Sequence, residues 1–146
     1  MRILAAIPPE AEAILRRAVG DAATLLPAHT IEEAYGVAAQ SVDIIVCGIN
    51  FDESRMFELL RAVKADSRLK KTPFVCVRLI GTNLTPTLTQ SLQISCTLLG
   101  AAQFIDFYAL ERTFGPDAAP LELARMIFAL ADKSAHSNQS PTEAAS

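Results

Sequence analysis

Tryptophan, histidine and cysteine are scarce in this sequence of 146 residues. It contains no tryptophan, two histidines and three cysteines, and aromatic residues make up 6% of it. So few aromatic side chains argue against a surface that stacks nucleic-acid bases. A structural zinc site needs nitrogen or sulfur ligands at characteristic spacings, and the cysteines and histidines form no such cluster. We therefore expect no metal, no cofactor and no framework of disulfides.

The sequence also lacks a basic surplus and a long apolar run. Its 13 basic and 16 acidic residues give a net charge of −3, which argues against nucleic acid as a partner. No apolar stretch reaches about 18 residues, the length that a membrane span requires, so we expect no membrane contact. The apolar segment at the N-terminus is too short for a signal peptide, and the expected location is the cytoplasm.

Hydrophobic residues make up 51% of the sequence, and short apolar runs alternate with amphipathic segments along it. Unbroken apolar runs are typical of strands that are buried on both faces, as in parallel sheets. Such strands need helical crossovers, so the alternation predicts an α/β fold, a three-layer α/β/α sandwich around a five-stranded parallel sheet. The expected strands span 2–7, 22–26, 43–49, 73–80 and 101–107, and the expected helices begin at Pro9, Thr30 and Ser54 or span 84–99 and 121–130.

The composition changes near the C-terminus. Residues 1–132 carry the alternating pattern and, at about 150 residues per domain, form one expected domain. From Lys133 onward the residues are mostly polar and small, which is typical of a flexible tail or linker over 133–146.

A series of spaced residues surrounds Gly48. An acid and four apolar residues precede it, and an aromatic–acid–Leu–Leu group, a basic segment and a proline follow it, at 43–47, 57–60, 68–71 and Pro73. This series, with Gly100-Ala101 before the last expected strand, resembles the receiver domain of two-component response regulators. The resemblance covers residues 2–132. It implies a flavodoxin-like topology with strand order 2-1-3-4-5 and a role in bacterial signalling.

The residues that carry out phosphoryl transfer in that family are missing. Receivers place an acidic pair after the first strand, a phosphoacceptor aspartate after the third, a switch Ser or Thr after the fourth and a lysine after the fifth. The corresponding residues here are Ile7, Pro8, Gly48, Arg78 and Phe107. Carboxylates hold Mg²⁺ and accept the phosphoryl group, and none stands at these positions. We therefore expect a pseudo-receiver that signals by protein–protein interaction without phosphorylation.

A second hypothesis concerns polar residues near the same ends of the strands. Open α/β sheets bind ligands at the carboxyl ends of their strands, where Asn50, Asp52 and Arg78 are expected. These residues would form a site for a small anion; alternatively, Arg78 would pair with an acid such as Asp52. An enzyme is not expected, because His29 and His136 belong to no Ser–His–Asp or Cys–His set.

Residues 79–105 contain no charged side chain. An expected core stripe at helical spacing consists of Leu84, Leu88, Leu92, Cys96 and Leu99. The outer side of this helix then carries only Thr, Gln and apolar residues, which is typical of a covered surface. In receivers this helix, the next strand and the last helix form the usual dimer and output surface. The expected interface residues, for a protein partner or a homodimer, are Gln90, Ile94, Thr97 and Leu98; a neutral helix under the C-terminal tail is the alternative.

Two cysteines, Cys47 and Cys76, fall on strands that are neighbours in the family's topology. They would form either a redox pair or part of the core. Free cysteines are among the most buried residues and buried thiols are inert, so we expect core positions for them. Cys96, on the uncharged helix, is the best candidate of the three for a reactive thiol.

Overall fold

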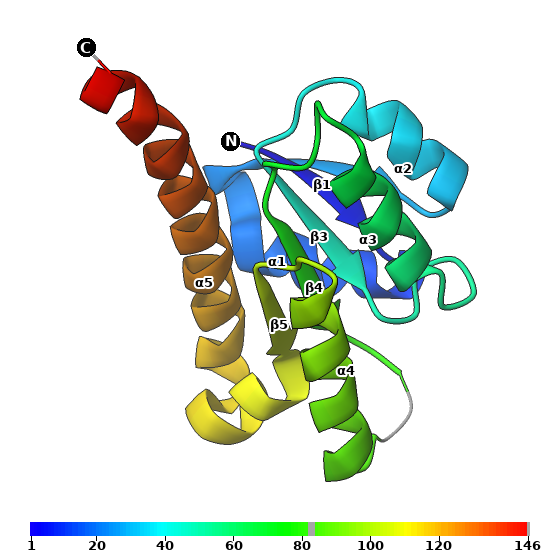
Figure 1. Cartoon of the computed structure of the whole chain (residues 1–146). Helices are drawn as coiled ribbons and strands as arrows, with labels where there is room; N and C mark the ends of the chain where they lie inside the picture. The colour runs from blue at the N-terminus through cyan, green and yellow to red at the C-terminus, as the bar shows by residue number, and fades with distance from the viewer. Residues whose placement is uncertain (82–83, 146) are drawn as a thin grey trace.

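Five parallel strands form the central sheet of the protein, β1 (Arg2–Ala6), β2 (Thr24–Ala28), β3 (Ile44–Gly48), β4 (Phe74–Arg78) and β5 (Gln103–Asp106). The helices are α1 (Glu12–Val19), α2 (Ile31–Ala38), α3 (Met56–Ala65), α4 (Pro86–Leu98) and α5 (Phe107–Ala145) (Figure 1). The computed structural model describes residues 1–81 and 84–145, with side chains up to residue 135. The strands lie in the order β2-β1-β3-β4-β5 with parallel pairing throughout, so the predicted α/β fold and strand order are confirmed.

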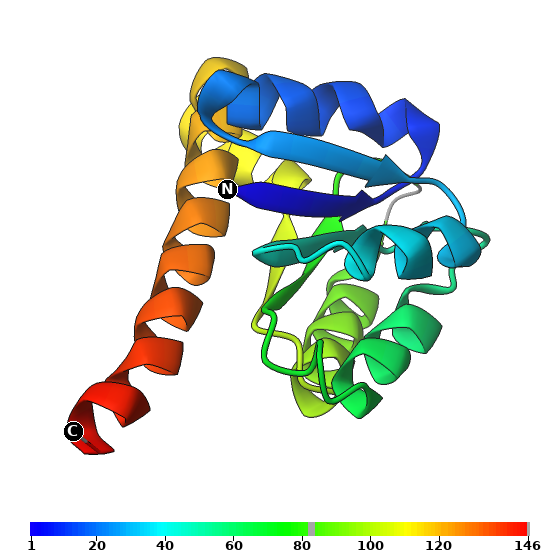
Figure 2. The same ribbon diagram turned by 90° about the horizontal axis from the view of Figure 1, so that it is seen from above.

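Helices cover both faces of the sheet, which is the middle layer of three (Figure 2). The core on one face lies under α1 and α5, and the core on the other lies under α2, α3 and α4. Because side chains alternate across a strand, each strand contributes to both cores. In β1, Ile3 and Ala5 belong to the first core and Leu4 and Ala6 to the second, and all four are fully buried. This double burial explains the unbroken apolar runs of the sequence.

The start of α2 follows the capping pattern of the sequence. Thr30 Oγ1 accepts a hydrogen bond from the backbone N–H of Glu33 at 3.2 Å. The Glu33 carboxylate in turn accepts one from the backbone N–H of His29 at 2.9 Å. These bonds satisfy backbone groups that have no partner within the helix, and they fix where α2 begins.

The loop between β3 and α3 has a left-handed backbone. Asp52, Glu53 and Ser54 have φ angles of 43°, 55° and 65°. A capping residue normally has an extended backbone, so the predicted cap by Ser54 is wrong. α3 begins after Arg55, which forms no side-chain cap.

The second strand lies two residues later than predicted, at Thr24–Ala28 rather than 22–26. It includes Pro27, whose nitrogen carries no hydrogen to donate to a neighbouring strand. β2 is at the edge of the sheet and pairs with β1 alone, so one missing donor is tolerated there.

α5 begins earlier and ends later than the sequence predicted. The helix expected at 121–130 spans Phe107–Ala145, and it has a kink at Gly115 (Figure 1). Gly115 has φ 86° and ψ 164°, a conformation open essentially to glycine alone, and Pro116 starts the second segment. The kink lets the first segment, 107–114, follow β5 directly while the second packs against α1. The division into a domain at 1–132 and a tail at 133–146 stays a prediction.

Replacing Gly115 with alanine is expected to destabilise the protein. The new Cβ would meet no atom within 4 Å, but the backbone conformation is strained for any residue with a side chain. Such strain lowers the free energy of unfolding by about 1–3 kcal/mol. The matched control is Gly36→Ala inside α2, where a Cβ also meets no atom within 4 Å. That change should stabilise by about 0.5–1 kcal/mol. Urea unfolding measures the free energy of unfolding of both variants. Equal effects of the two changes would contradict the strained backbone conformation at Gly115.

Candidate functional site

Gly48, which the sequence analysis matched to the phosphoacceptor position of receivers, lies at the carboxyl end of β3. A Cβ atom on Gly48 would lie 3.5 Å from Ile7 Cγ2 and 3.5 Å from Pro8 Cδ. Ala11 and Leu79 also line this space, which is too small for a water molecule. Ile7 is fully buried. The space therefore offers neither a carboxylate nor room for a hydrated magnesium ion.

Arg78 and Phe107, the other two residues expected near Gly48, lie on opposite faces of the sheet. Phe107 belongs to the core under α1 and α5, together with Val77 and Leu79. Arg78 is the last residue of β4 and lies between Val77 and Leu79 in the chain. Because side chains alternate across a strand, the side chain of Arg78 turns to the opposite face, which α4 covers, and lines a cleft there. The structure thus does not gather the five expected residues around one space.

Arg78 forms a buried ion pair with Asp106, its register partner on β5. Its Nη1 donates to Asp106 Oδ2 at 3.3 Å, and the two side chains are 7% and 12% exposed. Asp106 Oδ1 accepts a further hydrogen bond from the backbone N–H of Tyr108 at 3.0 Å, which caps the start of α5. The Arg78 guanidinium lies 4.4 Å from the centre of the Tyr108 ring. These three residues link β4, β5 and α5, and the acid beside Arg78 is Asp106 rather than Asp52.

The residues expected to bind a small anion have separate partners. Asn50 Nδ2 donates to the backbone carbonyl of Ile80 at 3.2 Å. Asp52 Oδ2 accepts from the backbone N–H of Ile31 at 2.9 Å and from Arg55 Nη1 at 3.2 Å, at the N-terminus of α2. Asn50 therefore fixes the loop after β4, and Asp52 fixes α2 to the loop after β3. No contact among Asn50, Asp52 and Arg78 joins them into one site in the described part of the chain.

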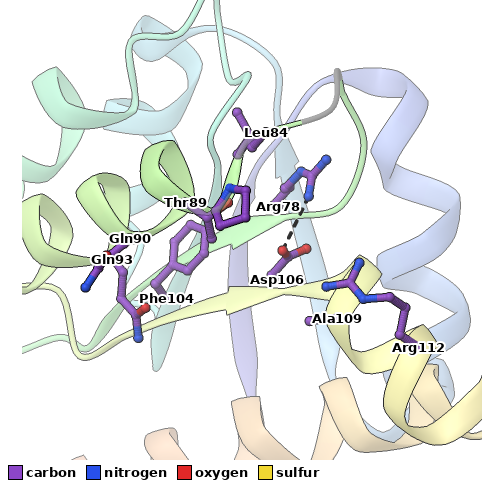
Figure 3. Close-up of a pocket in the computed structure, with 10 residues that line it drawn as sticks. Arg78, Leu84, Thr89, Gln90, Gln93, Phe104, Asp106, Ala109 and Arg112 are labelled. Carbon is purple, nitrogen blue, oxygen red and sulfur yellow. Dashed lines mark hydrogen bonds and ion pairs between the residues drawn. The ribbon is translucent and has the colours of Figure 1, made fainter.

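A cleft of about 470 Å³ lies between α4, β5 and the first segment of α5 (Figure 3). Its walls are formed by Arg78, Leu84, Pro86, Thr89, Gln90, Gln93, Phe104, Asp106, Ala109 and Arg112. The sequence analysis missed Asp106 and Arg112. Their proximity to Arg78 depends on the register of β4 with β5 and on the direction of segment 107–114, and no local pattern encodes either. Asp106 falls inside the strand expected at 101–107, so its role as the cap of α5 was not predicted.

The four expected interface residues on α4, Gln90, Ile94, Thr97 and Leu98, are all exposed. Ile94 is 52% exposed and Leu98 is 81% exposed. The expected core stripe is correct at Cys96, which is fully buried, but wrong at Leu88, which is 53% exposed. Leu88 belongs to the N-terminal part of α4, and this part of the helix projects beyond the ends of the strands (Figure 1).

All three cysteines are buried, and Cys47 and Cys76 are register partners on β3 and β4. Burial raises the pKa of the Cys47 thiol, and a hydrogen bond with Cys96 together with burial raises the pKa of Cys76. These thiols stay protonated and inaccessible at neutral pH, as in a core.

Within residues 1–81 and 84–145, no cluster of His, Cys, Asp and Glu has the composition to hold a metal ion. No helix in the same ranges is long and apolar enough to cross a bilayer.

Comparison with known proteins places this fold among receiver domains. No protein-family model matches the chain, and no curated protein sequence matches it significantly. A sensor protein from Polaromonas sp. JS666 superposes with a TM-score of 0.67 at 15% identity, over 91% of this chain and 97% of that one. The chemotaxis response regulator CheY4 of Vibrio cholerae gives 0.62 at 21% identity, over 86% and 97%.

A third similar structure is the signal receiver domain of a signal transduction histidine kinase from Syntrophus aciditrophicus. Its TM-score is 0.65 at 18% identity, over 90% of both chains. At these identities the likeness shows a shared fold. The chain has the flavodoxin-like fold of response-regulator receiver domains.

Replacing Asp106 with asparagine keeps the shape of the α5 cap but removes the charge that balances Arg78. Loss of one member of a buried pair lowers the free energy of unfolding by about 3–5 kcal/mol, and we expect the lower end because asparagine still accepts a hydrogen bond. The double variant Arg78→Met/Asp106→Asn removes both charges and should recover most of this loss.

The control is the exposed pair Asp66–Arg68, in which the Arg68 side chain is 72% exposed. Asp66→Asn should change the free energy of unfolding by less than about 1 kcal/mol. Urea unfolding of the four variants, with the Arg78→Met single variant completing the cycle, gives the coupling energy. A coupling near zero at Arg78–Asp106 would show that this pair is not formed in solution.

Proposed function

We propose that the protein is a receiver-like regulatory module that acts by protein–protein contact, without phosphorylation and without catalysis, in the bacterial cytoplasm. The observation that carries this proposal is the narrow space at Gly48, which is too small for a water molecule and is bounded by Ile7 and Pro8 where phosphoryl transfer needs acids. In receivers, activation links the bound phosphoryl group to a switch residue at the end of the fourth strand. Here that residue, Arg78, is already bonded to Asp106, so the link between β4 and β5 needs no phosphoryl group.

The surface proposed for this contact is centred on α4. Its exposed residues include Ile94 and Leu98, and the segment 79–105 around them carries no charge. An exposed apolar and uncharged surface gains from being covered by a second protein, because burial removes apolar area from water and desolvates no charge. The occupant is a protein partner or a second copy of the chain.

The protein is expected to take up no phosphoryl group from acetyl phosphate and Mg²⁺, because Gly48 offers no nucleophile. Intact-mass measurement after incubation checks this, with a receiver that retains its acidic residues as the positive control.

Millimolar Mg²⁺ should also leave the melting temperature of the protein unchanged. An ion present at 100 times its dissociation constant would add about 2.7 kcal/mol and raise the melting temperature by several degrees. A base-labile adduct on Asp52 would contradict the proposal.

Replacing Leu98 with glutamate is expected to weaken self-association or partner binding by about 2 kcal/mol or more, because it places a charge inside an apolar contact. The monomer should stay folded, since Leu98 is 81% exposed. The control is Tyr35→Glu, which changes a 43% exposed residue on α2, far from α4. Sedimentation measures association and circular dichroism measures folding. Unchanged association and partner binding in the folded Leu98→Glu variant would remove this surface from the proposal.

A further inference from the structure

The cleft between α4, β5 and segment 107–114 has two chemically different ends. In Figure 3 the side chains of Arg78, Asp106 and Arg112 converge at one end, and the Arg112 guanidinium extends from its helix toward Asp106. The amides of Gln90 and Gln93 lie at the other end. The cleft volume of about 470 Å³ lies within the range of roughly 300–1,000 Å³ that is typical of small-molecule sites.

The charged end carries a net positive charge. Arg78 and Asp106 form an ion pair and balance each other. Arg112 is exposed, and in the described part of the chain it forms no ion pair. The opposite wall of the cleft comes from the segment 79–105, which has no charged residue that could balance the positive charge of Arg112. The residues around the cleft therefore sum to one positive charge, and a guanidinium binds a carboxylate through two parallel hydrogen bonds.

The remaining walls suit a flat apolar group with a polar edge. Phe104 is largely buried but reaches the cleft, and Pro86 and Ala109 add further apolar surface. Gln90 and Gln93 are exposed on α4, and each amide both donates and accepts hydrogen bonds. Six of the ten residues that line the cleft are polar or charged, so polar groups that can orient a ligand surround a smaller apolar patch.

We propose that this cleft binds a small organic monoanion, an aromatic carboxylate, with the carboxylate on Arg112 and the ring against Phe104 and Pro86. Arg78 and Asp106 form the fixed inner wall behind the carboxylate. This site is distinct from the space at Gly48 and from Asn50 and Asp52. It does not depend on the proposed function, because the cleft is formed by residues of the single chain alone. A bound ligand contacts α4 and α5 together.

The probe for this site is 1-naphthoate, titrated into ¹⁵N-labelled protein. The amide resonances of Thr89, Gln93 and Ala109 should shift, with a dissociation constant of about 1 mM, the affinity expected at the ligand efficiency of drug-sized molecules. Arg112→Gln should weaken binding at least about tenfold, as loss of a charge-assisted pair does. Gln93→Glu, which puts a negative charge into the cleft, should weaken it as well. Both changes are at exposed side chains, so the variants should fold.

Two controls separate a specific site from general attraction. Arg61→Gln removes an exposed positive charge on α3 and should leave the affinity unchanged. The neutral analogue 1-naphthamide should bind at least about tenfold more weakly than 1-naphthoate, because it cannot pair with a guanidinium. Equal binding of the two compounds, equal effects of the Arg112 and Arg61 changes, or shifts confined to residues outside the cleft would each overturn the proposal.

Discussion

Covering both faces of one parallel sheet is the constraint on which the rest of this structure depends. Parallel strands are joined by helical crossovers, so the chain alternates between strand and helix, and each strand is apolar on both sides. At the carboxyl ends of the strands a side chain turns to one face or the other. Gly48 lies against Ile7 and Pro8 on the α1 side, whereas Arg78 turns toward α4. The two neighbouring strand ends thus have separate surroundings: Gly48 packs against apolar atoms, and Arg78 forms an ion pair with Asp106.

The Arg78–Asp106 pair illustrates the free-energy cost of burying charged side chains in such a sheet. Removing a guanidinium and a carboxylate from water costs several kcal/mol for each ion, and only close contact and further hydrogen bonds offset that cost. Asp106 meets both needs, because one oxygen pairs with Arg78 and the other caps α5 through the Tyr108 N–H. Neither Arg78 nor Asp106 can change alone without leaving a buried charge. The link therefore exists in the unmodified chain and holds β4, β5 and α5 in one arrangement.

The positions of the strands followed from the sequence because burial on both faces produces unbroken apolar runs, whereas their order followed from the resemblance to receiver domains. The predictions that were wrong concern features that depend on contacts between distant parts of the chain. Edge position allowed Pro27 inside β2, and α5 begins at Phe107, with a kink at Gly115, rather than at the expected residue 121. Leu88 fits a helical stripe, but the helix outruns the sheet at that point. The partner of Arg78 depends on strand register, a long-range property, so the sequence offered Asp52 in its place.

The absence of charge from 79–105 has electrostatic as well as hydrophobic consequences. Around Arg55, for example, Asp52 and Glu58 neutralise the local field. α4 has no acid that could do the same for Arg112, and the residues of α4 that line the cleft are uncharged. A single cation then determines the sign of the cleft. The absence of charge from 79–105 thus leaves Leu98 among uncharged neighbours and leaves the charge of Arg112 unopposed across the cleft. The proposed protein contact and the proposed anion binding therefore depend on the same feature of the sequence.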